Sequence, residues 1–227
     1  MKNVLHALAA LAACLGLTGC VGTEQAWYAQ RSGFLGDYSM LREGGSGEPA
    51  LIYMNPKLDF RAYDKVLVEQ AAIWRPPGSS LEEVPKGDLE HLSFLLTAKI
   101  MEAAKRENLK IVREPGPGVM RIRSAITEAE QSTKVMDLAT SIVPLPSLPK
   151  VATGTRAFVG RASIEAEIQD ATTGERMAAM VDRRAGNRLP HGVDASWTDV
   201  EQAFQYWSDR FAYRLCQGRG GKFCVPP

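Results

Sequence analysis

The chain has 227 residues, and its 27 basic and 26 acidic side chains give a formal net charge of +1 at pH 7. This balance argues against nucleic-acid binding, which normally requires a strongly positive face. With only three histidines and four cysteines, the sequence also offers few ligands for a metal or groups for Ser-His-Asp catalysis, so we expect no metal and no cofactor.

The first 20 residues have the pattern of a bacterial lipoprotein signal. Lys2 precedes an apolar run from Val4 to Leu17, about 14 residues long, which suits a signal peptide and is too short to span a membrane. The run ends in Leu17-Thr18-Gly19-Cys20, which resembles the lipobox at which a signal peptidase cuts before a lipidated cysteine. We expect residues 1–19 to be removed and Cys20 to carry lipid. The alternative, a short buried helix, lacks a capping residue.

The expected cellular location and domain organisation follow from this signal. In enteric lipoproteins an Asp just after the cysteine resembles an inner-membrane retention signal, whereas here Val21 and Gly22 follow. We therefore expect a protein held in the outer membrane by its lipid and facing the periplasm. Loss of Lys2 with the signal leaves 26 basic and 26 acidic residues. Residues 20–49 should form a lipidated tether and docking arm, and residues 50–227 a single domain.

Within the arm, four apolar side chains should pack on the body unless they form a partner-binding peptide: Phe34, Leu35, Tyr38 and Leu41. Lys65 to Trp74 predicts a central strand. A helix capped by Asp88 follows, with an apolar stripe at helical spacing and a stop at Asn108. The stripe consists of Leu89, Leu92, Leu96, Ile100 and Ala103. A short strand over 109–113 comes next, and a Pro/Gly turn leads from it into residues 119–128.

Residues 161–169 alternate between apolar and polar side chains and predict a strand with one buried and one solvent-facing side. Residues 177–183 should return as its hairpin partner. Ser196 and Asp199 form a capping-box pattern before a final helix, whose stripe is Val200, Phe204, Trp207, Phe211 and Leu215. These elements predict an α+β fold: a two-layer sandwich in which a mixed or antiparallel sheet carries two helices on one face.

Cys216 and Cys224 remain as a pair once Cys14 leaves with the signal and Cys20 is lipidated. In a compartment that permits disulfides we expect them to be bonded and to clamp the end of the last helix. Free thiols or a redox pair are the alternatives, although the Cys-x-x-Cys spacing of redox sites is absent.

Candidate catalytic groups are few. His191 lies in a loop with Asp194 three residues on, where the carboxylate could orient the imidazole or simply support the turn. Glu128 with Glu130, and Glu165 with Glu167, share strand faces, and paired acids about 5–10 Å apart serve glycoside cleavage. Alternating Glu on a solvent-facing strand is the ordinary cause of such pairs. The basic run Arg183, Arg184 and Arg188 should be a solvated strand end or a contact for anionic lipid.

The insertion from Lys134 to Val159 is too long for a hairpin turn and too apolar for free solvent. Its large apolar side chains must be buried against the body, a membrane or a partner. We take them as candidates for partner binding, with a cover over the protein's own sheet as the alternative. They are Val135, Met136, Leu138, Ile142, Val143, Leu145 and Leu148.

Four segments in this order resemble the bacterial lipoprotein family catalogued as domain of unknown function 3313. They are SGFLGDYSML (32–41), LIYMNPKLDFRAYDKVLVE (51–69), DATTGE (170–175) and the helix from Trp197 to Leu215. The resemblance covers nearly the whole mature chain, and it implies no biochemical activity. The order of strand, helix and hairpin is also similar to that of periplasmic domains in secretion and assembly lipoproteins, which transfers no site.

We therefore expect a non-catalytic lipoprotein that binds another envelope protein. Two alternatives stay open. One is a hydrolase of an envelope polymer that uses His191 with Asp194 or the Glu pairs. The other is a carrier of a lipid or apolar small molecule beneath the insertion, which would need an enclosed apolar cavity.

Overall fold

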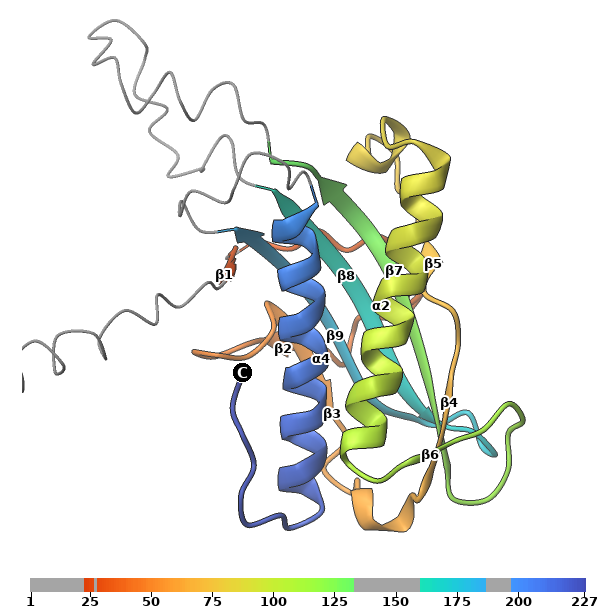
Figure 1. The fold of residues 1–227 in the computed structure, drawn as a ribbon. Coiled ribbons are helices and arrows are strands. Elements are labelled where there is room, and N and C mark those ends of the chain that lie inside the picture. The colour runs from red at the N-terminus through yellow and green to blue at the C-terminus, as the bar shows by residue number, and fades with distance from the viewer. Residues whose placement is uncertain (1–22, 27, 133–159, 187–196) are drawn as a thin grey trace, which may run out of the picture.

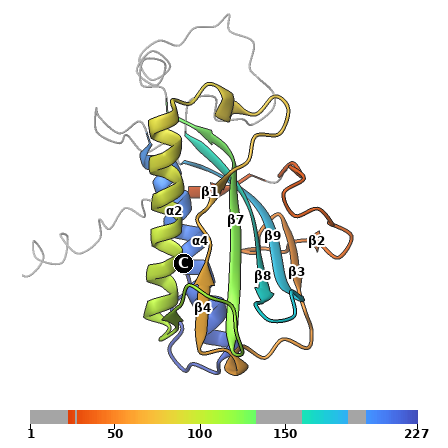
Figure 2. The ribbon, with the colours of Figure 1, turned by 90° about the vertical axis from the view of Figure 1, so that its right-hand side faces the viewer.

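The computed structural model describes residues 23–26, 28–132, 160–186 and 197–227. A single sheet carries two long helices on one face, and the N-terminal arm crosses the opposite face (Figures 1 and 2). The predicted α+β fold with a mixed sheet and two helices on one face is therefore confirmed. None of the helices in the described part of the chain has the length and apolarity needed to cross a membrane.

The sheet has the order β2-β3-β9-β8-β7-β4-β6, while β1 pairs with β9 and β5 with β7. Its strands are β1 (Thr23–Gln25), β2 (Arg42–Glu43), β3 (Leu51–Met54), β4 (Lys65–Val68), β5 (Ala72–Ile73), β6 (Lys110–Ile111), β7 (Val119–Glu130), β8 (Arg161–Asp170) and β9 (Arg176–Gly186). β4 runs parallel to β6 and β7, as β5 does to β7, and the other pairs are antiparallel. The three long strands β7, β8 and β9 form its centre.

Helix α2 (Lys86–Arg106) follows the predicted stripe: all five predicted positions are buried. The helix ends near Asn108, which has a left-handed φ of 60°. The predicted cap is wrong, because the helix begins after Pro85 and no side chain within the described ranges caps it. Asp88 lies in the first turn and its Oδ2 instead accepts a hydrogen bond of 3.2 Å from Trp197 Nε1 at the start of the second helix.

Helix α4 (Thr198–Gly218) buries Val200, Phe204, Trp207 and Leu215 against the sheet and α2, while Phe211 packs at the edge of that core. Ser196 lies outside the described residues. Asp199 is buried, and its Oδ2 accepts a 2.7 Å hydrogen bond from the Gly160 N–H at the start of β8. Its carboxylate therefore ties the helix to the sheet.

The predicted strand from Lys65 to Trp74 is interrupted. β4 ends at Val68 and β5 begins at Ala72, and side chains of α2 bond the backbone between them. Thr97 Oγ1 accepts from the Ala71 N–H at 2.9 Å, and Ser93 Oγ donates to the Ala71 carbonyl at 2.6 Å. These two polar groups of the helix replace the missing ladder bonds.

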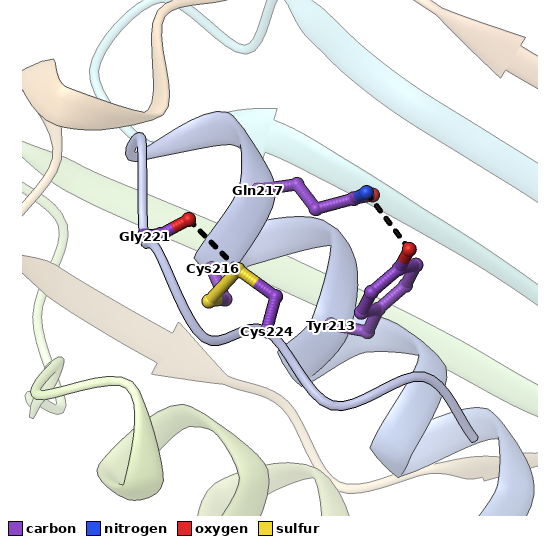
Figure 3. Close-up of a disulfide and its surroundings, with 5 residues drawn as sticks. All are labelled: Tyr213, Cys216, Gln217, Gly221 and Cys224. Carbon is purple, nitrogen blue, oxygen red and sulfur yellow. Dashed lines mark hydrogen bonds between the residues drawn. A yellow bond between two sulfur atoms is a disulfide. The ribbon is translucent and has the colours of Figure 1, made fainter.

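Cys216 and Cys224 form the expected disulfide, with their Cα atoms 5.6 Å apart (Figure 3). The bond joins the last turn of α4 to the C-terminal tail. The chain reverses through Gly220, whose φ of 76° favours glycine. Gln217 Nε2 donates to Tyr213 Oη at 2.9 Å alongside (Figure 3). The disulfide thus holds the tail against the end of the helix.

Candidate functional site

The face of the sheet opposite the helices is not a free solvent surface. Leu35 is buried there against Ala179 and Val181 of β9, and Phe34, Tyr38 and Leu41 pack around it. The expected packing of these four arm residues is confirmed. The expected solvent-facing side of β8 is wrong, because Glu165 and Glu167 are 0% and 1% exposed beneath the arm.

Glu165 holds the arm through three hydrogen bonds. One carboxylate oxygen accepts from the Ser32 N–H at 2.5 Å, and the other accepts from the Leu35 N–H at 3.2 Å and from Tyr38 Oη at 2.6 Å. Burial, together with the adjacent Glu165 carboxylate, raises the pKa of the Tyr38 hydroxyl to about 12. Tyr38 therefore remains a neutral donor throughout the physiological pH range.

Glu167 is paired with two arginines, Arg123 at 2.5 Å and Arg176 at 2.8 Å. Arg176 also donates to the Leu35 carbonyl at 2.8 Å and to the Asp37 carbonyl at 2.6 Å, so it joins the buried carboxylate to the arm. The guanidinium of Arg123 lies 5.2 Å from the centre of the Phe34 ring. Both carboxylates of β8 therefore serve to attach the arm.

A cleft of about 860 Å³ lies at one end of this face. The ends of the long strands contribute Glu128, Glu130, Ser163 and Arg183 to it, and other segments complete its walls. These walls are Tyr28, Gln30 and Ser32 of the arm, the loop from Pro76 to Pro85, Gln131, and Trp197 at the start of α4. Tyr28 is 75% exposed, so it presents a large aromatic ring at the rim.

Glu128 is at the centre of the polar groups in the cleft. Its carboxylate accepts from Arg183 Nη2 at 2.5 Å and Nε at 2.8 Å, and from Ser163 Oγ at 2.6 Å. Burial alone would raise the pKa of Glu128, but the hydrogen bonds and positive charge of Arg183 outweigh it and hold the pKa below its usual value. Glu130 is likewise paired with Arg161, whose Nε donates at 2.8 Å.

These pairings limit what the cleft can do chemically. A carboxylic acid that donates a proton near neutral pH needs a raised pKa, and the pKa of Glu128 is lowered. Each Glu of the two predicted pairs is already bound to arginines or to the arm. The arrangement is suited to fixing the shape of a binding surface.

The basic run at the end of β9 is not the solvated strand end or lipid contact that the sequence predicts. Arg183 is bound to Glu128 in the cleft. Arg184 is 6% exposed, lies 3.4 Å from the centre of the Tyr206 ring and donates to Thr23 Oγ1 at 2.6 Å. It is therefore a packing residue between α4 and β1, and it is not available to lipid head groups. Arg188 lies outside the described residues.

Sequence reasoning missed Asp182, a buried acid on the helix side of β9. It accepts hydrogen bonds from Trp207 Nε1 at 2.7 Å, the Ala50 N–H at 3.0 Å and Gln25 Nε2 at 3.2 Å. Burial raises the pKa of its carboxyl. Asp182 comes two residues after the apolar Met180, and side chains at this spacing share one face of a strand. This alternation was a signal that Asp182 faces the core.

Several predicted site residues lie outside the described residues. They are Cys20, the pair His191 and Asp194, and the seven apolar residues Val135, Met136, Leu138, Ile142, Val143, Leu145 and Leu148. Glu130 at the end of β7 pairs with Arg161 at the start of β8, so the two strand ends that flank the apolar insertion lie side by side at the cleft. Across the described ranges, no group of three or more His, Cys, Asp or Glu side chains is placed to hold a metal ion.

Solved structures with a similar arrangement come from several bacteria. The PelC dodecamer from Paraburkholderia phytofirmans matches with a TM-score of 0.41 and 11% identity, over 76% of this chain and 96% of that one. A candidate lipoprotein from Caulobacter crescentus CB15 gives a TM-score of 0.38 and 14% identity, over 72% and 96%. A protein of family DUF330 from Xanthomonas campestris gives 0.40 and 12%, over 74% and 92%. At these values the likeness concerns general architecture alone.

A comparison with curated protein sequences finds no significant match. The model of the family described as "Protein of unknown function (DUF3313)" matches residues 30–211, a range that includes the arm, the sheet and both helices. The chain therefore belongs to the DUF3313 family.

Proposed function

We propose that the protein is a lipoprotein anchored in the outer membrane, with a non-catalytic domain that binds another envelope protein on the periplasmic side. The lipobox ending at Cys20 supports the anchor. The Cys216–Cys224 disulfide supports an oxidising compartment.

The observation that carries the binding role is the bonding of Glu128 in the cleft. Arg183 and Ser163 occupy its carboxylate, and its pKa is lowered. A partly buried ion pair of this kind fixes side-chain positions and leaves the cleft with a defined shape. The exposed ring of Tyr28 at the rim supplies the type of aromatic contact that dominates many protein interfaces.

The apolar insertion is the second part of the proposed interface. The ends of the sheet that flank it, Glu130 and Arg161, lie beside the cleft. Its seven large apolar side chains would add apolar area to the polar groups of the cleft. The proposal therefore places partner recognition in the cleft together with residues 134–159.

Photo-crosslinking in cells tests this proposal. A photoreactive amino acid at Tyr28 should give a specific crosslinked species, because Tyr28 lies in the cleft and is 75% exposed. The same amino acid at Phe94, which is 62% exposed on α2, is the matched control and should not give that species.

Replacement of residues 134–159 by a short Gly/Ser turn should abolish the species and leave the thermal midpoint nearly unchanged. Crosslinking at Phe94 alone, or a species that survives the replacement, would contradict the proposal. A large fall in the midpoint would instead show that the segment covers the protein's own core, since each fully buried side chain contributes about 1.5–3 kcal/mol.

The anchor is tested separately. Cys20→Ser should move the protein from the membrane fraction to the soluble periplasm, because the lipid is its proposed attachment. A variant that still sediments with the outer membrane after a salt wash would show that the domain has its own affinity for the membrane.

A further inference from the structure

A second hollow lies on the helix side of the sheet, and its lining differs in chemistry from that of the cleft. It has a volume of about 120 Å³ and almost wholly apolar walls. β7, β8, β9 and β3 form its floor, and α4 covers it with Trp207, Phe211 and Leu215. Figure 2 shows the layer of helices that packs on this face of the sheet.

The hollow exists because small side chains occupy the middle of the floor. Ser124 of β7 is directly opposite Ala166 of β8, and Ala178 of β9 is opposite Ile168 in the same layer. Ala166 and Ala178 are only half-buried, although they lie on central strands and face the helices. The aromatic residues of α4 do not extend far enough to fill this space.

Two buried polar atoms at this hollow have no hydrogen-bond partner in the part of the chain that the structure describes. Ser124 Oγ is buried in the floor and has no hydrogen-bond partner among the described residues, and its residue is 2% exposed. Arg210, also in the lining, has a buried Nε without a hydrogen-bond partner in the same part of the chain. Buried polar groups in folded proteins are normally bonded, so these two atoms leave hydrogen-bonding capacity in the lining that a bound ligand could use.

Arg210 differs from Arg214, the next arginine on α4, because only Arg214 has a carboxylate partner among the described residues. Arg214, one turn further along α4, pairs with Glu48 at 3.2 Å. No carboxylate of the described residues pairs with Arg210, whose guanidinium has Tyr213 as its aromatic neighbour at 5.8 Å. A guanidinium beside apolar walls offers a bidentate site to an anionic group whose remainder is apolar.

We propose that this hollow binds one alkyl chain that carries an anionic head group, with the head group at Arg210 and the chain over Ser124, Ala166 and Ala178. The volume is close to that of cavities of about 150 Å³ that hold a benzene molecule, so it accommodates a short stretch of one chain and not two chains. Both a free fatty acid and an acidic phospholipid have this chemistry.

Titration calorimetry with decanoate tests the site in the full chain carrying Cys20→Ser, which avoids detergent. Decanoate should bind saturably with one site per chain. Decanol and decyltrimethylammonium should bind at least about tenfold weaker, because they lack the anion. Arg210→Gln should reduce decanoate affinity to that of decanol. Lys86→Gln is the matched control, since Lys86 is 89% exposed on α2 and the substitution removes the same charge.

Filling the hollow provides a second, independent measurement. Ser124→Leu should abolish decanoate binding and leave the circular dichroism spectrum unchanged. If that variant does not fold, Ala178→Val tests the same space with a smaller change. Equal affinities for decanoate and decanol, or binding that survives both Arg210→Gln and filling, would overturn the proposal.

Flotation with phosphatidylglycerol vesicles separates the two sources of the ligand. Flotation that Arg210→Gln abolishes would assign the chain to an acidic phospholipid. Decanoate binding without flotation would assign it to a free fatty acid. Either result leaves the crosslinking test of the cleft unaffected, because the two sites lie on opposite faces of the sheet.

Discussion

Replacement of Glu165 by Gln should release the N-terminal arm from the sheet while the rest of the domain stays folded. The side chain keeps its shape, but it loses its charge and one of its two acceptor oxygens. The two acceptor oxygens now serve Ser32 on one side, and Leu35 and Tyr38 on the other. In the variant an NH₂ group must face at least one of these donors.

The magnitude follows from the bonds lost. A hydrogen bond to a charged group contributes about 1.5–3 kcal/mol, and a neutral bond about 0.5–1.5 kcal/mol. The variant loses at least one charged bond and weakens the others, so we expect a cost of about 2–4 kcal/mol. Tyr38→Phe removes a single donor and should cost about 1.5 kcal/mol, near the lower limit because Tyr38 is partly exposed. The loss cannot exceed the free energy that docks the arm.

Hydrogen exchange read by mass spectrometry, together with urea unfolding, measures both parts of this prediction. Peptides from residues 32–41 should lose protection in Glu165→Gln, and peptides from α2 should not. Glu102→Gln, an exposed position on α2, is the matched control and should change stability by less than about 0.5 kcal/mol. Unchanged protection at Leu35 in Glu165→Gln would refute the assignment of Glu165 as the group that holds the arm.

Three further results are expected. Burial raises the folded-state pKa of Asp182, so the stabilisation by its carboxyl is full below the unfolded pKa of about 3.9 and is lost as the pH rises through the folded pKa. Asp182→Asn should therefore gain stability relative to wild type between about pH 3.5 and 7 in urea unfolding. A constant difference in the free energy of unfolding would contradict this. Reduction of Cys216–Cys224, which encloses a short loop, should lower the free energy of unfolding by about 2–3 kcal/mol, as measured against the oxidised protein. Gly218→Ala should cost about 1–3 kcal/mol in thermal unfolding, because its Cβ would lie 2.0 Å from Phe60, and a neutral result would show that the ring moves aside.

The helices and the long hairpin could be predicted from sequence because their apolar spacing is a local property. Leu92 and Leu96 recur at helical spacing, and Phe204 with Trp207 does the same in the last helix. Such stripes are decisive because a helix must bury them against something, and the sheet is the available layer. The same local rule failed at Lys65 to Trp74, where α2 side chains bond the backbone from outside the strand.

The buried carboxylates could not be predicted in this way. Glu165 and Glu167 alternate with apolar residues, which is also the pattern of a solvent-facing strand surface. Their burial depends on an arm more than 120 residues away in sequence, whose backbone N–H groups bond Glu165. A pattern within one strand contains no information about such a distant partner. The ion pairs of Glu128 and Arg183 join different strands and were missed for the same reason.

The pairing of β1 with β9 has a consequence for how far the domain reaches from the membrane. Thr23 is three residues after Cys20, and an extended chain covers at most about 3.6 Å per residue. A lipid on Cys20 would hold this edge of the sheet within about 11 Å of its attachment point. The cleft shares this edge, because the Ala26 N–H donates to the carbonyl of Arg183 at 2.9 Å. Such a short connection would confine the search for a partner to the surface of the membrane that holds the lipid, so a partner remote from that surface could be reached only if it extended to the surface itself.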